Sequence, residues 1–239
     1  MEVTSLYREP ERRQQLSFPA LEFHDVFKIF RSGPAETVAL RGLELRIEPR
    51  EFVALYGPSG SGKSTALHLA AGLDAPSAGD VSAFGRSIPR LGEAALADYR
   101  GREVAIVFQN ENLWSDLSTR QNVRLSLTLG GGRRRGISAR VDRALTAFDL
   151  QDRARQRAGL LSGGEQQRVA IAAAAAREAP LVLADEPTAE LDVRNEQRVV
   201  SAFRRLRDDF GSTVVIVTHS ARVADAADRV VEIRDGRLA

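Results

Sequence analysis

The chain of 239 residues has no cysteine, so disulfides, thiolate metal sites and cysteine nucleophiles are excluded. It also lacks a long apolar run: the longest, residues 169–176, is far short of the roughly 20 residues that a membrane-spanning helix needs. Its formal net charge of +2 is too small to favour a nucleic-acid partner. We therefore expect a chain that is soluble by itself, binds no nucleic acid and makes membrane contact only through partners.

The first 19 residues contain no apolar core of the kind found in secretory signals. They are polar and charged, and Pro10 and Pro19 interrupt regular structure. We expect residues 1–19 to form a flexible N-terminal extension, followed by one domain that covers residues 20–239.

The remainder, with hydrophobic residues at 43% of the chain, can bury a sizeable core. Short apolar runs predict strands at residues 21–26, 43–47, 52–56, 81–84, 104–108, 181–184, 213–218 and 229–234. Helical patterns lie at residues 63–71, 92–99, 164–177, 193–210 and 221–227. This alternation predicts an α/β fold with a mostly parallel sheet. Arg-rich sequence between 118 and 160, broken by a Gly-rich loop at 130–136, predicts an inserted helical lobe.

A glycine-rich segment directly after the strand at 52–56 matches the phosphate-loop pattern G-x-x-x-x-G-K-[ST]. It consists of Gly57, Pro58, Ser59, Gly60, Ser61, Gly62, Lys63, Ser64 and Thr65. Its glycines let consecutive backbone N–H groups converge on phosphate oxygens, and the helix that follows adds its dipole. We expect Lys63 to reach the β- and γ-phosphates of ATP, Ser64 to ligate Mg²⁺ and Thr65 to support the α-phosphate side. A chance match, on the order of 1% in such a chain, makes a plain linker the weaker alternative.

Two acidic residues, Asp185 and Glu186, end the apolar strand at 181–184. A carboxylate near a core is costly unless it meets a cation or hydrogen-bond donors. We expect Asp185 to bind Mg²⁺, mostly through its water shell, and Glu186 to polarise the attacking water as general base. A surface turn capped by acids is the alternative, and the phosphate loop in the same chain makes it the weaker one.

The segment Leu-Ser-Gly-Gly-Glu-Gln-Gln-Arg at residues 161–168 resembles the signature motif of ABC ATPases and lies between the phosphate loop and the acidic pair, as in that family. The resemblance covers about residues 20–239. It implies a P-loop NTPase fold with a mostly parallel core sheet, a small antiparallel β part and a helical subdomain at about 110–178. It also implies a head-to-tail dimer around two ATP molecules, in which Ser162, Gly163, Gly164 and Glu165 complete the site of the opposite subunit.

Further motifs fall in the order that the family resemblance implies. Gln109 resembles the Q-loop glutamine, which contacts Mg²⁺ and couples to the membrane subunit. Asp192 closes a segment that resembles the D-loop, which touches the opposite subunit, and His219 resembles the switch histidine that reads the γ-phosphate. Phe30 occupies the place of an aromatic that stacks on adenine, with core packing as the alternative. For Trp114, both a contact with the membrane subunit and packing in the core stay open.

Two departures from the family pattern are visible, Ala173–175 in place of a common Arg-Ala-Leu and the charged Glu190 in the D-loop. Neither touches the phosphate loop, Asp185, Glu186 or His219, so we expect hydrolysis of ATP. His24 and His68 have no motif around them and are expected to be structural.

Details around residues 165–170, 184–188 and 227–231 look most like the lipoprotein-release, macrolide-efflux and cell-division ATPases. The resemblance implies a subunit that works with transmembrane permease subunits at the cytoplasmic face of the inner membrane, in an export, extraction or mechanotransmission complex. A regulator of cell division or envelope signalling that transports no substrate remains the alternative, because the substrate is chosen by the partner.

Overall fold

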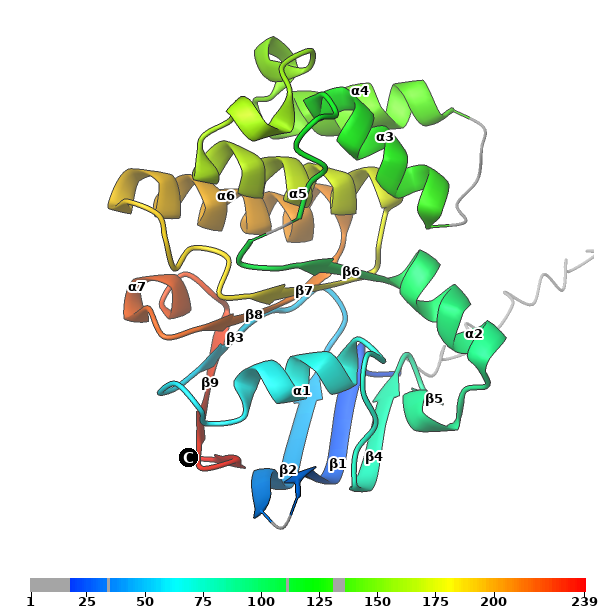
Figure 1. Ribbon diagram of the computed structural model, residues 1–239, viewed down its shortest axis with the longest axis vertical. Helices are drawn as coiled ribbons and strands as arrows, with labels where there is room; N and C mark the ends of the chain where they lie inside the picture. The colour runs from blue at the N-terminus through cyan, green and yellow to red at the C-terminus, as the bar shows by residue number, and fades with distance from the viewer. Residues whose placement is uncertain (1–17, 34, 111, 131–135) are drawn as a thin grey trace, which may run out of the picture.

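The computed structural model describes residues 18–33, 35–110, 112–130 and 136–239 (Figure 1). Almost all of the predicted extension, and residues 131–135 of the predicted Gly-rich loop, lie outside the described residues.

A six-stranded sheet forms the centre of the domain, in the order β10-β9-β3-β8-β7-β6. Its strands are β3 (Phe52–Tyr56), β6 (Val104–Val107), β7 (Leu181–Asp185), β8 (Thr213–Thr218), β9 (Arg229–Arg234) and β10 (Arg237–Leu238). All neighbours pair in parallel except β10, which is antiparallel to β9. The central strands are almost uninterrupted apolar runs because helices and a second sheet cover both faces. The predicted α/β class with a mostly parallel sheet is confirmed.

A second, antiparallel sheet has the order β2-β1-β4-β5. It comprises β1 (Leu21–Ser32), β2 (Ala35–Ile47), β4 (Ala78–Ala83) and β5 (Arg86–Ser87). The predicted strands at 21–26 and 43–47 were too short, because β1 and β2 continue as a hairpin beyond the core. Apart from the buried Leu40, residues there are half-buried or exposed, and bulges shift the register near Asp25, so no continuous apolar run marks the outer part of these strands.

Helices fill the space on both sides of the parallel sheet (Figure 1). Helix α1 (Lys63–Ala70) lies between the two sheets. On the opposite face α5 (Gly163–Arg177) and α6 (Val193–Phe210) lie side by side, with α3 (Thr119–Leu129) and α4 (Ile137–Ala147) packed on α5. The short helices α2 (Glu93–Asp98) and α7 (Ala221–Ala224) lie at the periphery, and a π-helical turn, Tyr99–Glu103, follows α2.

The alanine run in α5 has a packing explanation. Ala172, Ala174, Ala175 and Ala176 are each at most 3% exposed and belong to the core cluster that joins α3, α4, α5 and α6 to the sheet. Small side chains allow this central helix to approach its neighbours closely. The departure from Arg-Ala-Leu at Ala173–175 therefore fits a tightly surrounded helix.

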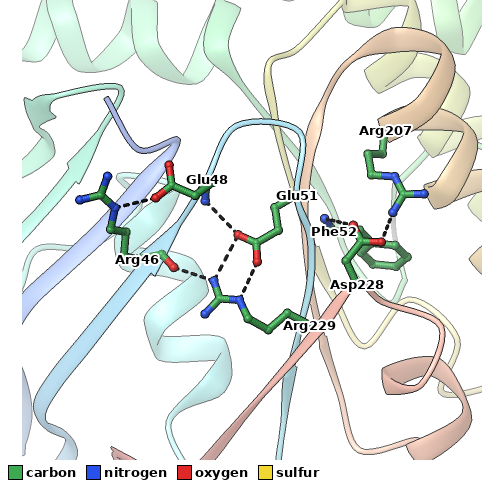
Figure 2. Close-up of polar contacts among 7 residues, drawn as sticks. All are labelled: Arg46, Glu48, Glu51, Phe52, Arg207, Asp228 and Arg229. Carbon is green, nitrogen blue, oxygen red and sulfur yellow. Dashed lines mark hydrogen bonds and ion pairs between the residues drawn. The ribbon is translucent and has the colours of Figure 1, made fainter. Parts of the chain in front are cut away.

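Residues at the start of β9 link the two sheets to α6 (Figure 2). Arg229 donates to both carboxylate oxygens of Glu51, at 2.6 and 3.2 Å, and to the Arg46 carbonyl at 2.6 Å. Asp228 accepts the Phe52 amide at 2.9 Å and also pairs with Arg207. Asp228 and Arg229, both in the 227–231 segment, thus connect neighbouring elements at the edge where β3 and β9 begin.

Candidate nucleotide site

Parallel strands bring their carboxyl ends to one edge of a sheet, which is where ligands bind in such folds. The segments after β3, β6, β7 and β8 carry Lys63, Gln109, Glu186 and His219 respectively. Four segments that are far apart in the sequence therefore meet at one edge because of the strand order β3-β8-β7-β6.

The loop between β3 and α1 requires glycine at two positions. Gly62 has a φ of +99°, and a Cβ there would lie 2.4 Å from the Ala39 carbonyl oxygen. A Cβ on Gly57 would lie 2.2 Å from the Ile233 carbonyl oxygen. Both distances are shorter than any real Cβ contact, so only glycine lets the loop pack on β2 and β9 and still turn into α1.

Lys63 opens α1 with its ammonium group held inside the loop. Nζ donates to the carbonyl oxygens of Gly57 at 2.9 Å and Pro58 at 2.7 Å, and the residue is 4% exposed. Burial lowers the pKa of Lys63, and the negative charges of Glu186 and Asp185 partly oppose that shift. The loop thus encloses a fixed donor at the start of a helix, where an anion is favoured.

Ser64 and Asp185 connect the first turn of α1 to the end of β7. The Ser64 hydroxyl donates to Oδ1 of Asp185 at 2.9 Å. Both residues line a cleft of about 340 Å³ together with Phe108, Gln109, Asn110 and Glu186. Hydroxyl, amide and carboxylate oxygens are hard ligands, so this donor set fits Mg²⁺.

Glu186 and His219 lie in contact at the ends of adjacent strands. Nδ1 of His219 is 3.0 Å from Oε2 of Glu186. Glu186 has a φ of 44°, rare for a residue with a side chain, and its amide donates to the Val217 carbonyl at 3.0 Å. Beside His219, the Thr218 hydroxyl accepts the Ser220 amide at 3.0 Å. A second hollow of about 390 Å³ is lined by both Glu186 and His219.

The segment that carries Gln109 is held by a contact that the sequence analysis did not anticipate. Gln167 of α5 is 5% exposed, and its amide nitrogen donates to the carbonyls of Phe108, at 3.1 Å, and Gln109. The Asn112 side chain also holds the Phe108 backbone: its oxygen accepts the Phe108 amide at 2.8 Å, and its nitrogen donates to the Phe108 carbonyl at 2.6 Å. Gln167 lies in the polar segment that precedes the apolar run at 169–176, so no local pattern marked it as buried, and its buried amide finds its partners only in the packed structure.

Gln109 itself donates to Glu190 at 3.1 Å, and the neighbouring Asn110 donates to the same oxygen at 3.2 Å. Through these two hydrogen bonds, the Glu190 carboxylate joins the segment after β6 to the segment after β7. The Gln109 amide oxygen is left as an acceptor beside the cleft.

Ser162 caps α5 through a capping box. Its hydroxyl accepts the Glu165 amide at 3.3 Å, and its own amide donates to Glu165 Oε2 at 2.9 Å. Burial raises the pKa of Glu165, but the hydrogen bonds from Arg153 and Ser162 outweigh it and hold that pKa below its usual range. Ser162 and Gly163 are exposed, and neither lines the cleft of Ser64 and Asp185. Within one chain, the structure does not bring the signature segment to the phosphate loop.

Asp192 caps α6. Its carboxylate accepts the Asn195 amide at 2.9 Å and the Asn195 side chain at 2.7 Å. These two bonds are the main cause that lowers the pKa of Asp192. Gly164 packs against Asn195 so closely that a Cβ would lie 2.9 Å from Asn195 Cβ, so the starts of α5 and α6 form one unit.

The two aromatic residues left open by the sequence are on the surface. Phe30 on β1 is 45% exposed, and Lys28 Nζ lies 5.0 Å from the centre of its ring. Trp114 is 66% exposed. Core packing is therefore wrong for both. None of the helices in the described ranges is long and apolar enough to cross a membrane.

Comparison with known proteins gives matches over most of the chain. A family model described as "ABC transporter" matches residues 40–189. An uncharacterized ABC transporter ATP-binding protein from Thermotoga maritima is 40% identical over 91% of this chain and 93% of its own length. The lipoprotein-releasing system ATP-binding protein LolD of Chromohalobacter salexigens is 39% identical over 91% of this chain and 92% of its own.

The macrolide export ATP-binding/permease protein MacB of Azoarcus sp. is 39% identical over 92% of this chain, which spans 33% of that longer protein. Among solved structures, a dimeric post-hydrolysis state of the ATP-binding cassette MJ0796 bound to ADP and Pi superposes with a TM-score of 0.81. It is 35% identical and covers 91% of this chain and 96% of its own.

Proposed function

Because this chain belongs to the ABC transporter family and is an ATPase of that family, we propose that it powers a membrane complex as a dimer in which each ATP is held between two copies. The observation that carries this proposal is the cleft of Ser64, Gln109, Asp185 and Glu186, which adjoins the phosphate loop but contains no signature residue. The family resemblance inferred from residues 161–168 is confirmed by the comparisons.

Each residue at the sheet edge has a role that its position supports. The amides of Gly60, Ser61, Gly62, Ser64 and Thr65, with the Lys63 ammonium, bind the phosphates, while Pro58 and Ser59 shape the loop. Glu186 takes the proton of the attacking water, and His219 moves from Glu186 towards the γ-phosphate. The exposed ring of Phe30 stacks on adenine.

Mg²⁺ held by Ser64, Asp185 and Gln109 would neutralise charge on the β- and γ-phosphates. The hydrogen bond between Ser64 and Asp185 supports this set, because it holds two oxygen ligands side by side before any cation binds. Gln109 supplies the third oxygen from a loop that Gln167 and Glu190 position, so the ligand set can respond to movement of that loop.

The signature segment serves the second copy. Ser162, Gly163 and Gly164 begin α5 with amides that lack intrahelical partners, and Glu165 holds Ser162 in place. An exposed helix start of this kind attracts an anion, and in a head-to-tail dimer that anion is the partner's γ-phosphate. Asp192 orders the start of α6 beside it. The dimeric state of the MJ0796 cassette supports this arrangement.

The partners are transmembrane permease subunits, and the complex lies at the cytoplasmic face of the inner membrane. The names of the relatives, a lipoprotein-releasing system and a macrolide exporter, favour export or extraction over import. Trp114, exposed just after the Gln109 segment, is the anchor for a permease element, since aromatic residues are enriched at interface centres.

Phosphate release from ATP and Mg²⁺ tests the proposed function. The purified chain should hydrolyse ATP, and Lys63→Ala should lower the rate about 10²-fold or more by removing the charge that faces the transferred phosphoryl group. Arg90→Ala, which removes an exposed positive charge elsewhere, is the matched control and should keep the rate. Equal rates for the two variants would refute the phosphate-loop assignment.

A further inference from the structure

A cavity of about 550 Å³ opens between the end of α4, α5 and α6. It shares no lining residue with the nucleotide cleft. Four arginines line it: Arg168 on α5 and Arg194, Arg198 and Arg205 on α6. The two helices lie side by side over this stretch (Figure 1). A volume of this size is typical of sites for small molecules.

The charge of the cavity is poorly compensated. Asp149 is its one acidic lining residue, and it pairs with Arg205 at 3.0 Å, so four guanidinium groups and one carboxylate leave a net charge of +3. Within the described part of the chain, no carboxylate oxygen lies within 4.0 Å of the guanidinium nitrogens of the other three arginines, and the charges of Glu165 and Asp149 on Arg168 and of Asp192 on Arg194 act from farther away. Arg194 and Arg198 are also one turn apart on α6, a spacing at which like charges destabilise a helix.

Arg168 adds a buried donor without an acceptor. Its Nη1 is inaccessible to solvent and has no hydrogen-bond partner. Burial, and then the like charge of Arg198, lower the pKa of Arg168. A buried donor left unpaired is destabilising, and more so when the group is charged. An anion in the cavity would offset the repulsion among the arginines, and it would contact the part of the Arg168 side chain that lines the cavity.

We propose that this arginine cavity binds a small anion that carries at least two phosphate groups. Guanidinium groups present paired donors that match phosphate oxygens, and the charge of a diphosphate is close to the +3 of the lining. The side-chain amide of Gln197, which also lines the cavity, supplies a further donor. All four arginines line this one cavity, so a compact anion with several charges matches them better than an acidic peptide segment, whose charges are spread along a chain.

Binding there would act on the nucleotide machinery through the two helix starts. Arg168 lies six residues after Ser162 on α5, and Arg194 lies two residues after Asp192. Gly164 already packs on Asn195. An anion that bridges Arg168 and Arg194 would therefore fix the signature segment relative to the start of α6. An effect of the anion on ATP turnover rests on the proposed function, whereas the existence of the binding site does not depend on that function.

Calorimetric titration of pyrophosphate tests the site directly, in a chain that carries Lys63→Ala so that binding at the phosphate loop is weakened. We expect saturable binding that Arg198→Gln weakens about tenfold or more, since it removes charge-assisted hydrogen bonds. Arg237→Gln on β10 removes the same charge from another exposed position and should leave the affinity unchanged. Arg194→Gln, at an exposed first-turn position, serves as a second variant if Arg198→Gln folds poorly.

Three outcomes would overturn the proposal: no binding of pyrophosphate to the Lys63→Ala chain, equal weakening by Arg198→Gln and Arg237→Gln, or tighter binding of hexaglutamate than of pyrophosphate. The last result would assign the cavity to an acidic protein segment. Because the readout is binding and not turnover, failure here leaves the proposed ATPase roles of Lys63 and Glu186 standing.

Discussion

Nδ1 of His219 lies 3.0 Å from Oε2 of Glu186, so the two side chains at the ends of β8 and β7 share one contact beside the cleft. The strand register explains this pairing, because Asp185 lies opposite Val217 and each chain segment leaves the sheet at the same edge. His219 is exposed and Glu186 is half-buried, so the histidine is the partner that can swing away. The contact links the proposed general base to the proposed sensor of the γ-phosphate.

Glu186→Gln should therefore keep ATP binding and block turnover. Loss of a positioned general base costs about 10²–10⁴-fold in rate. The substitution also removes repulsion between the carboxylate and the γ-phosphate, so an ATP-bound dimer should accumulate. Size-exclusion chromatography with ATP and Mg²⁺, together with phosphate release, measures both effects.

Glu93→Gln, which removes an exposed carboxylate from the start of α2, is the control and should leave turnover and dimerisation as they are. A monomer with unchanged turnover in the Glu186→Gln variant would show that Glu186 is not the base.

Gln167→Leu should loosen the segment that carries Gln109. Leucine fills similar space but leaves the Gln109 carbonyl without its donor, while the Phe108 carbonyl keeps the Asn112 side chain, so the cost should be about 1 kcal/mol. We expect a lower free energy of unfolding in urea and a raised KM for Mg²⁺-dependent turnover. Gln151→Leu, which changes an exposed glutamine outside the site segments, is the control. Identical unfolding curves for the two variants would contradict the positioning role.

At a pH above the pKa that Asp228 has in the unfolded chain, its carboxylate should stabilise the fold, and this contribution should be lost in acid. Burial raises the pKa of Asp228, but hydrogen bonds from Arg207 and the Phe52 amide outweigh it, and the pKa in the fold is below its usual value. Stability is therefore gained above about pH 4 and lost as pH falls through the lower, folded pKa. After allowance for solvent screening, Asp228→Asn should cost about 0.5–1 kcal/mol at pH 7.

The difference in unfolding free energy between the parent and Asp228→Asn should shrink as pH falls below about 4. Asp225→Asn, an exposed carboxylate just after α7, should show no such dependence. A gap between parent and Asp228→Asn that stays constant from pH 7 to pH 3 would mean that the charge does not contribute.

The sequence predicts those features of the structure that are marked by a pattern of neighbouring residues. The predicted spans of α6, β8 and β9 coincide with the structure because each has an unbroken period or apolar run. The outer half of the β1–β2 hairpin was missed because its apolar residues are interrupted by charged and small ones and form no continuous run. The contact from Gln167 to Phe108 joins positions 59 residues apart, and the arginine cavity joins three helical segments. Such contacts depend on packing between elements, which no local pattern contains.

The composite site gives the last prediction, in which two inactive variants restore each other. One variant carries Lys63→Ala and the other Ser162→Arg, whose bulk blocks the exposed start of α5. In a head-to-tail heterodimer both lesions fall in one site, so the second site has an intact phosphate loop and an intact signature. Homodimers of either variant have two damaged sites. Vanadate trapping of nucleotide, counted per dimer, should therefore be higher in the mixture than in either variant alone.

Trapping is the better readout than steady-state turnover, because cooperation between the two sites would hide a single repaired one. The heterodimers must be demonstrated by pull-down of two different tags. Ser115→Arg is the matched control for added bulk and charge, since Ser115 is exposed and lies outside the phosphate-loop, signature and carboxylate segments. A mixture that traps no more nucleotide than its parents, with heterodimers present, would mean that each chain builds its site alone. The exposed position of Ser162, outside the cleft of its own chain, favours the opposite result.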